Sequence, residues 1–310
     1  MKVSFVIPTL NRVNELERLL QSFLYQTQKP DEIIIVEQGD EHLSTIGLKH
    51  HNTLPIHIYN VDFESLTKAR NFGVEKSSGD IIGFLDDDIV LTKNYVENIK
   101  RFFSSHPGTL GVQGVITNFR QGHTKKVGGN PFVYSLYNVF AKFFLLNNSS
   151  DKNRLLWSGR NQYASKVNKI MNCEWLSGIG NYHRRVFDEF TFDEFLDGYA
   201  LGEDKLFSYP ISEKYQKSLC VDPEIQCEHH HAPLGRPQDK KWVEMKIYYT
   251  YYLWSKLFKK RGFFAYLAFF WASVGDLFIV FFSVILFQNT FKFLWWHIIC
   301  YAKLLFGKHI

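Results

Sequence analysis

The sequence has few cysteines, no long basic block and only a short apolar run at its beginning. Its four cysteines are widely spaced and form no C-x-x-C pair, which argues against a zinc knuckle or a disulfide framework and fits a reducing cytoplasm. The net charge of +5 is modest and is not gathered into one basic run, so a membrane surface is a better candidate partner than nucleic acid. The run Met1 to Pro8 is too short for a signal peptide and is typical of a first strand. We therefore expect the first part of the chain to stay inside the cell.

Short β-branched runs alternate with helical patterns in the first third of the sequence. The 310 residues suffice to bury a sizeable core. We expect strands at 3–7, 32–36, 56–61 and 81–85, and helices at 15–25 and 65–74. This order predicts an α/β fold with a mostly parallel sheet and flanking helices.

Three carboxylates, Asp86, Asp87 and Asp88, follow the apolar run Ile81 to Leu85. Adjacent like charges raise one another's pKa unless a cation or oriented donors offset them. Carboxylate oxygens suit Mg²⁺ or Mn²⁺, which in turn bind phosphate oxygens. An isolated acidic triplet would more simply be a solvated turn, but the preceding strand favours a site.

Other polar residues are expected at the same edge of the sheet, because parallel sheets bind ligands at the carboxyl ends of their strands. Thr9 and Glu37 follow the first two strands. A second acidic pair, Glu203-Asp204, follows Gly202. Its simplest explanation is a charge pair at a helix N-terminus, favoured by the helix dipole.

The composition changes near Trp242, so we expect domains at 1–240 and 241–310. The stretch 263–287 has Asp276 as its sole charge and is long enough to cross a hydrocarbon core of about 30 Å. A second apolar stretch, 291–306, carries basic residues and suits the membrane interface. We expect Asp276 to face Lys292, His297 or the first domain rather than lipid. The alternative is a pair of buried helices, although the nearby tryptophans and the basic run 259–261 resemble interfacial anchors on the cytoplasmic side.

With these residues in view, positions 1 to about 235 resemble the family 2 inverting glycosyltransferases, which have the Rossmann-like A-type nucleotide-sugar-binding fold. Five pieces carry the resemblance, in the family's order: Phe5-Val6-Ile7-Pro8-Thr9-Leu10-Asn11-Arg12, Ala69-Arg70-Asn71-Phe72-Gly73, the D-x-D motif Asp86-Asp87-Asp88, Gly178 with Arg184-Arg185, and Gly202-Glu203-Asp204. One departure is Glu37-Gln38-Gly39-Asp40, where members often have two aspartates and Gly-Ser. The base contact and the choice of nucleotide therefore stay open.

The resemblance implies that Asp88 ligates Mn²⁺ or Mg²⁺, and that Asp86 and Asp87 face the ribose or the donor sugar. In the run Glu228 to His231, His231 is favoured as a further ligand, with a surface histidine run as the alternative. Seven other residues would complete the nucleotide-sugar site, although Pro8 and Asn11 also suit strand-stop and helix-cap roles: Pro8, Thr9, Asn11, Arg12, Glu37, Arg70 and Asn71.

Inversion needs a base opposite the diphosphate, and the resemblance assigns this role to Asp204, with Glu203 orienting it or binding the acceptor. Trp175 would pack either against the acceptor sugar or in the core.

The implied enzyme transfers a single sugar from a nucleotide diphospho-sugar, taken as UDP-linked, to a lipid-linked glycan or polysaccharide acceptor. It would act at the cytoplasmic face of the cell membrane, in the synthesis of cell-envelope polysaccharide. One alternative is a non-catalytic nucleotide-binding or scaffolding module, which the intact carboxylates disfavour. A nucleotidyltransferase would show a Gly-rich basic loop after the first strand, and a processive synthase a Gln-x-x-Arg-Trp motif; neither is found.

Overall fold

The computed structural model of the chain describes residues 1–39, 48, 53–118, 131–164, 166–230, 239–286 and 288–307. The chain forms two compact units. The first comprises Met1–His123 and Lys166–Gly235, and the second comprises Thr124–Ser165 and Arg236–Ile310.

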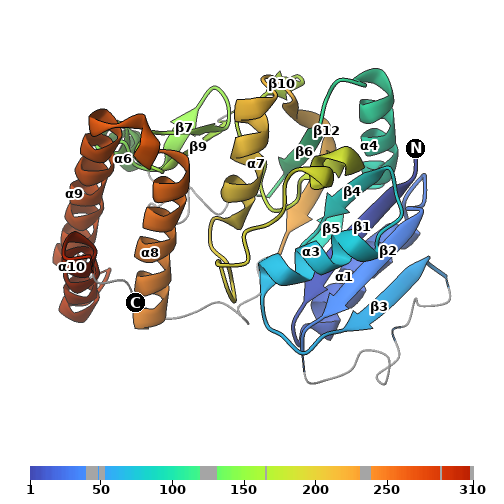
Figure 1. Ribbon diagram of the computed structural model, residues 1–310, viewed down its shortest axis with the longest axis horizontal. Coiled ribbons are helices and arrows are strands. Elements are labelled where there is room, and N and C mark those ends of the chain that lie inside the picture. The colour runs from blue at the N-terminus through green and yellow to red at the C-terminus, as the bar shows by residue number, and fades with distance from the viewer. Residues whose placement is uncertain are drawn as a thin grey trace. The chain divides into compact units, whose positions relative to one another are not determined.

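The first unit is built on a nine-stranded sheet in the order β10-β12-β6-β11-β4-β1-β2-β3, with β5 paired to β12 (Figure 1). The strands are β1 Val3–Thr9, β2 Glu32–Glu37, β3 Ile56–Asn60, β4 Ile81–Phe84, β5 Ile89–Leu91, β6 Gly111–Ile116, β10 Met171–Asn172, β11 Asn181–His183 and β12 Leu219–His229. The run β3-β2-β1-β4 is parallel, and so is the pair β6–β12. β11 lies antiparallel between β4 and β6. The predicted α/β class is confirmed, in the form of a mixed sheet.

Strand β1 runs through Pro8 to Thr9, although the sequence predicts a stop at Pro8. The Thr9 carbonyl accepts from Gln38 N on the β2 side, and the Val6 carbonyl accepts from Leu85 N on the β4 side. By alternation, the nitrogen of Pro8 points toward β4, whose pairing with β1 ends at Phe84. Pro8 is therefore tolerated because no ladder hydrogen bond is required there.

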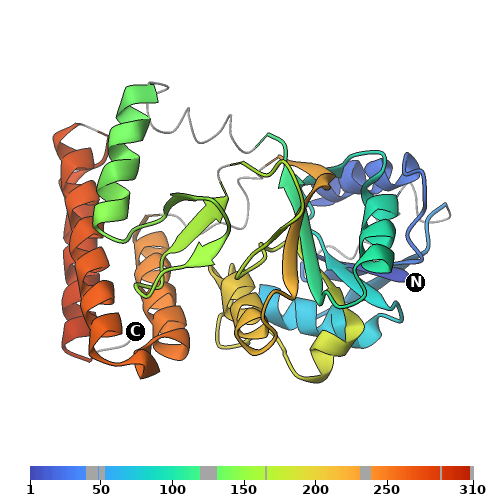
Figure 2. The same ribbon diagram turned by 90° about the horizontal axis from the view of Figure 1, so that it is seen from above.

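Helices cover both faces of this sheet, and alternate residues of β1 reach each layer (Figure 2). The helices are α1 Val13–Leu24, α3 Leu66–Lys76, α4 Tyr95–Ser105, the 3₁₀ helix η1 Arg184–Asp188 and α7 Glu203–Lys214. Phe5 belongs to a buried cluster with residues of α1 and α4, and Val6 to a second cluster with residues of α3 and α7. α1 follows Arg12, which makes no side-chain cap bond, and Asn11 has a left-handed φ of 54°. The predicted asparagine cap is thus not seen.

The strand order reverses between β1 and β4. The chain lays down β1, β2 and β3 in one direction and then returns to place β4 on the other side of β1. Because β1 and β4 are parallel, the loops after Thr9 and Phe84 leave the sheet at the same edge. Such a reversal opens a crevice at which ligands bind.

The second unit has four helices and a small sheet of order β7-β9-β8 in the described residues. Its elements are α6 Pro131–Phe143, β7 Asn148–Ser150, β8 Arg154–Leu155, β9 Asn161–Ala164, α8 Asp239–Leu257, the 3₁₀ helix η2 Lys259–Arg261, α9 Phe263–Ile285 and α10 Phe291–Leu305. This division differs from the predicted boundary at residue 240, because 124–165 joins the C-terminal helices. The cause is long-range packing: Ala141 and Phe144 form a buried cluster with Ala272 of α9.

Within the described residues, α9 is the one helix long and apolar enough to cross a membrane, with a mean hydropathy of 2.0 over 18 residues. A third of that window, 33%, is buried, which is low for a core helix. Asp276 pairs with Arg160, which lies within the predicted first domain 1–240, one of the three alternatives expected for this carboxylate. Its carboxylate is 2.6 Å from Arg160 Nη2 and accepts from the Tyr301 hydroxyl at 3.0 Å, both in the second unit.

Candidate functional site

Asp87, which follows β4, accepts hydrogen bonds from two residues at and after the end of β1. Thr9 Oγ1 donates to Asp87 Oδ2 at 2.8 Å, and Arg12 Nη1 donates to Asp87 Oδ1 at 2.9 Å. Burial raises the pKa of Asp87 to about 6, although Arg12 and Thr9 oppose that effect. Both oxygens of Asp87 therefore accept hydrogen bonds within the protein. The expected role of Asp87 in facing the donor stays a prediction.

Asp86, Asp88 and His229 each offer one ligand atom, and these atoms lie within 4.8 Å of one another. His229 Nε2 is 2.8 Å from Asp88 Oδ1. The antiparallel pairing of His229 with Ile89 carries this side chain to the acidic turn. His231, the predicted ligand, lies outside the described residues.

Sequence reasoning missed His229, although the histidine run held a usable signal. Alternation in a strand puts 229 and 231 on the face opposite to 230. His230 accordingly pairs with Glu228, with His230 Nε2 2.8 Å from Glu228 Oε2. Choosing between 229 and 231 requires knowing where β12 meets the acidic turn.

This cluster fits a divalent cation. Two carboxylate oxygens and one imidazole nitrogen are ligands that Mn²⁺ accepts, and Mg²⁺ would use chiefly the oxygens. His229 would hold such a cation through Nε2 in its neutral form, since a metal ligand must be deprotonated.

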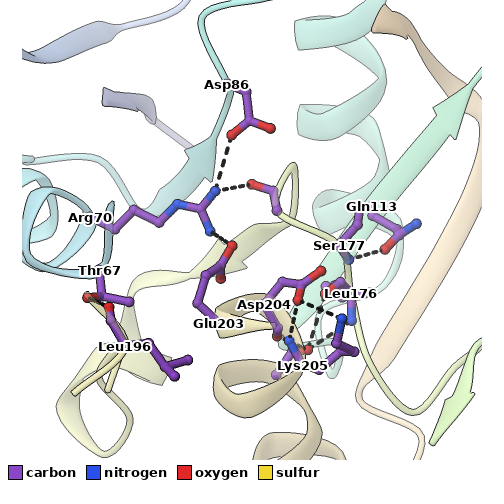
Figure 3. Close-up of polar contacts among 12 residues, drawn as sticks. Thr67, Arg70, Asp86, Gln113, Leu176, Ser177, Leu196, Glu203, Asp204 and Lys205 are labelled. Carbon is purple, nitrogen blue, oxygen red and sulfur yellow. Dashed lines mark hydrogen bonds and ion pairs between the residues drawn. The ribbon is translucent and has the colours of Figure 1, made fainter. Parts of the chain in front are cut away.

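Arg70 of α3 joins the acidic turn to the start of α7, as Figure 3 shows. Its Nη1 is 2.7 Å from Glu203 Oε1, and its Nη2 donates to Asp86 Oδ1 at 3.3 Å and to the Gly178 carbonyl at 3.1 Å. The side chain is buried, and its guanidinium lies 5.4 Å from the centroid of Phe84. Arg70 thus connects the acidic turn to the start of α7, and its assignment to the nucleotide-sugar site stays a prediction.

Glu203 and Asp204 begin α7 but differ in surroundings. Glu203 is buried against Arg70, and burial raises its pKa while the ion pair opposes that effect. Its Oε2 is buried with no hydrogen-bond partner among the described residues. Asp204 is more exposed, accepts from the backbone N–H of Lys205 at 2.8 Å, and lies 3.5 Å from Lys205 Nζ. Lys205 in turn lies over the fully buried ring of Trp175, which is therefore a core residue.

The loop after β1 and the loop after β2 approach each other closely at Asn11 and Gly39. Glu37 is buried and accepts from the Gly39 N–H at 2.8 Å. A Cβ at Gly39 would lie 2.0 Å from Asn11 Oδ1, so the close approach requires glycine.

Asn71 of α3 forms its hydrogen bonds with the chain segment that precedes α7. Its Nδ2 donates to the Phe192 carbonyl at 3.0 Å and to Glu194 Oε1 at 2.9 Å, and its Oδ1 accepts from Phe192 N at 3.0 Å. Asn71 thus holds the segment that precedes α7, while its assignment to the nucleotide-sugar site stays a prediction.

The predicted site residues fall into a connected group at the acidic turn and a second group at and near the end of β1. The structure brings Thr9, Arg12, the three aspartates, Arg70 and Glu203 into one connected set. Pro8 lies in β1, and Asn11 and Glu37 meet at the neighbouring loop.

Comparison with known proteins identifies the class. The model of glycosyl transferase family 2 matches residues 4–176, and because this is more than half of the chain, the chain belongs to that family. The predicted family, a family of transferases, is therefore confirmed.

Individual relatives resemble parts of the chain. The uncharacterized glycosyltransferase YwdF of Bacillus subtilis (strain 168) is 41% identical over 103 residues, which cover 33% of this chain and 38% of YwdF. The O-antigen chain rhamnosyltransferase RfbN of Salmonella typhimurium is 22% identical over 259 residues, covering 82% of this chain and 74% of RfbN. The chain thus spans well under half of YwdF.

Among solved structures, the 1–349 fragment of S. aureus TarS in complex with UDP-GlcNAc has a TM-score of 0.52 at 14% identity, covering 80% of this chain and 65% of that one. At this identity the likeness concerns the fold.

Proposed function

We propose that this protein is an inverting, metal-dependent glycosyltransferase that moves one sugar from a nucleotide diphospho-sugar to a lipid-linked glycan or polysaccharide. The observation that carries the proposal is the Arg70 bridge. Through Asp86 and Glu203, Arg70 links the acidic turn to the pair Glu203-Asp204. A donor-activating group and a base must act on one reacting carbon from two sides, and in this proposal the acidic turn and the carboxylate pair take these two roles.

Asp86, Asp88 and His229 would hold Mn²⁺ or Mg²⁺. When bound, the cation supplies charge neutralisation of the leaving diphosphate as a Lewis acid. TarS, which shares the fold, was solved with UDP-GlcNAc, and this supports a UDP-linked donor. Thr9 and Arg12 hold Asp87 and so fix the turn that carries both acidic ligands.

Asp204 takes the acceptor hydroxyl proton in this proposal. Its side chain is 17% exposed, whereas that of Glu203 is 8% exposed and paired with Arg70. A base must reach the acceptor, so the more exposed carboxylate is the better candidate. The unpartnered Glu203 Oε2 suits a second hydrogen bond to the acceptor or to a water.

The acceptor would arrive along the cytoplasmic face of the cell membrane. α9 and α10 are apolar, and a basic turn, Lys259–Arg261, precedes α9. The likeness to RfbN, an O-antigen chain rhamnosyltransferase, supports a polysaccharide or lipid-linked acceptor.

The test is to incubate the full chain with a panel of nucleotide sugars, Mn²⁺ or Mg²⁺, and membrane lipid extract. We expect release of a nucleoside diphosphate that depends on the cation, and a sugar recovered in the lipid fraction with inverted anomeric configuration. Donor binding without release would instead indicate a non-catalytic nucleotide-binding module. Formation of a nucleoside triphosphate and a sugar 1-phosphate when pyrophosphate is added would indicate a nucleotidyltransferase.

A further inference from the structure

α6 is fixed on α9 by its C-terminal end. Trp271 Nε1 donates to the Phe143 carbonyl at 2.8 Å, and the rings of Trp271 and Phe144 stack with centroids 4.8 Å apart. A Cβ at Gly275 would lie 2.4 Å from Phe144 Cβ, so this mid-helix glycine permits the close approach. The orientation of α6 on α9 is therefore set by specific contacts.

The side of α6 next to this contact is apolar and exposed, and at its end the Phe143 ring also reaches Trp271, with the centroids 5.4 Å apart. Leu136, Val139 and Phe143 are 62%, 65% and 63% exposed, and their spacing places them on one side of the helix. α9 and α10 expose many more: Phe263, Leu267, Phe270, Phe278, Phe281, Ile285, Phe291, Trp295 and Ile298. We call this set, with the three residues of α6, the apolar face of the second unit. So many exposed aromatic and aliphatic residues on three helices indicate an interaction surface rather than scattered surface residues.

Charges are arranged to suit a lipid surface. Asp276, the one charge in α9, pairs with Arg160 at 2.6 Å, and Lys246 Nζ lies 3.8 Å away. Exposed cations flank the apolar helices, at Lys259 and Lys260 before α9 and at Lys292 in α10. Anionic lipid headgroups attract such cations, while apolar side chains enter the boundary of the acyl chains.

The small sheet argues against a transmembrane α9. Arg160 directly precedes β9, the central strand of a sheet whose outer strands, β7 and β8, pair with no further strand among the described residues. A helix crossing the bilayer would place Asp276, near its middle, at the bilayer centre together with Arg160 and this sheet. Unpaired strand edges and irregular backbone are not stable in hydrocarbon. α9 therefore suits a position in the plane of the interface.

We propose that the second unit binds the surface of an anionic bilayer with α6, α9 and α10 in the interfacial plane, and that α6 contributes Leu136, Val139 and Phe143. This rests on the membrane attachment in the proposed function, and it specifies the partner surface and its geometry. It also adds a segment that lies outside the apolar C-terminal region.

The four native cysteines are all buried, so a single introduced cysteine can be labelled selectively. We would label Val139→Cys and Phe278→Cys in the full chain with an environment-sensitive dye. Vesicles of phosphatidylglycerol and phosphatidylethanolamine, brominated at defined chain depths, then serve as probe and quencher. Tyr25→Cys is the matched control, because Tyr25 is 67% exposed in the first unit.

Both test positions should be quenched by shallow bromines, and Tyr25→Cys should be unaffected. The variant Leu136→Ser/Val139→Ser/Phe143→Ser should partition into these vesicles at least about tenfold less, with an unchanged circular dichroism spectrum. Three results would overturn the proposal: no quenching at Val139→Cys, strongest quenching of Phe278→Cys by bromines at the bilayer centre, or a lipid-free dimer that the triple variant dissociates. None of these readouts uses sugar transfer, so they remain informative if the proposed enzymatic function fails.

Discussion

At the scale of single residues, the acidic turn gives three neighbouring aspartates three different environments. Asp86 faces Arg70, Asp87 faces Arg12 and Thr9, and Asp88 faces His229. Mutual repulsion is thus offset by separate partners, because successive residues of a tight turn point in different directions.

We predict that Asp88→Ala and His229→Ala each weaken Mn²⁺-dependent donor binding by at least about tenfold, because each removes one ligand of the proposed cation site. His230→Ala is the matched control, since His230 pairs with Glu228 instead. Calorimetric titration with donor and Mn²⁺ measures the effect. Wild-type affinity in the first two variants would contradict the site.

For the base, we predict that Asp204→Asn lowers turnover by at least about a hundredfold with little change in donor affinity, since general base catalysis contributes 10²–10⁴-fold. Initial rates of nucleoside diphosphate release and equilibrium donor binding provide the two measurements. If donor affinity falls while turnover persists, Asp204 belongs to the donor site instead.

The third prediction at this scale concerns the three contacts of Arg70. A lysine at this position is a point charge and cannot contact Glu203, Asp86 and the Gly178 carbonyl together. We expect Arg70→Lys to lower kcat by at least about tenfold while donor affinity changes less. Lys68→Gln on the exposed side of α3 is the control. Equal losses in both variants would show that Arg70 has no positioning role.

At the scale of elements, α9 combines an apolar sequence with one buried ion pair. Asp276 is held by Arg160, which precedes it by 116 residues in the sequence. The pairing explains how a carboxylate persists in an apolar helix, because a buried charge requires a close partner.

We predict that Arg160→Met destabilises the second unit by about 3–5 kcal/mol, because it leaves the Asp276 carboxylate buried without its nearest cation. The double variant Arg160→Met/Asp276→Leu should recover most of this loss, since neither charge remains. Denaturant unfolding followed by tryptophan fluorescence measures both. A double variant as unstable as the single one would show that packing, not charge, sets the cost.

At the scale of the whole molecule, removing everything after Arg261 is a poor test of membrane attachment. The deletion would also remove α9 and thereby uncover Ala141 and Phe144, which pack on it. We therefore predict the outcome for the full chain with Phe270→Ser/Phe281→Ser. Transfer to a lipid acceptor in vesicles should fall at least about tenfold relative to hydrolysis of the nucleotide sugar, because the acceptor is presented at the membrane. Parallel losses in both reactions would contradict a role for these helices in acceptor delivery.

Local sequence determined the α/β class, the strands and the acidic motifs. Period-2 and period-3.6 patterns are properties of neighbouring residues, so β2, β4, α1 and the apolar character of α9 could be predicted. The D-x-D turn and the Glu203-Asp204 pair were also visible, because each is contiguous.

The tertiary structure decided which distant residues meet. His229 reaches Asp88 because β12 pairs with β5, and Arg70 reaches Glu203 because α3 and α7 share one side of the sheet. Segment 124–165 packs with the C-terminal helices in the second unit. The ion pair between Arg160 and Asp276 forms there, between residues far apart in the sequence. Such pairings depend on strand order, register and the burial of charge in the folded chain. The hydrophobic periodicity of a single strand or helix carries no information about them.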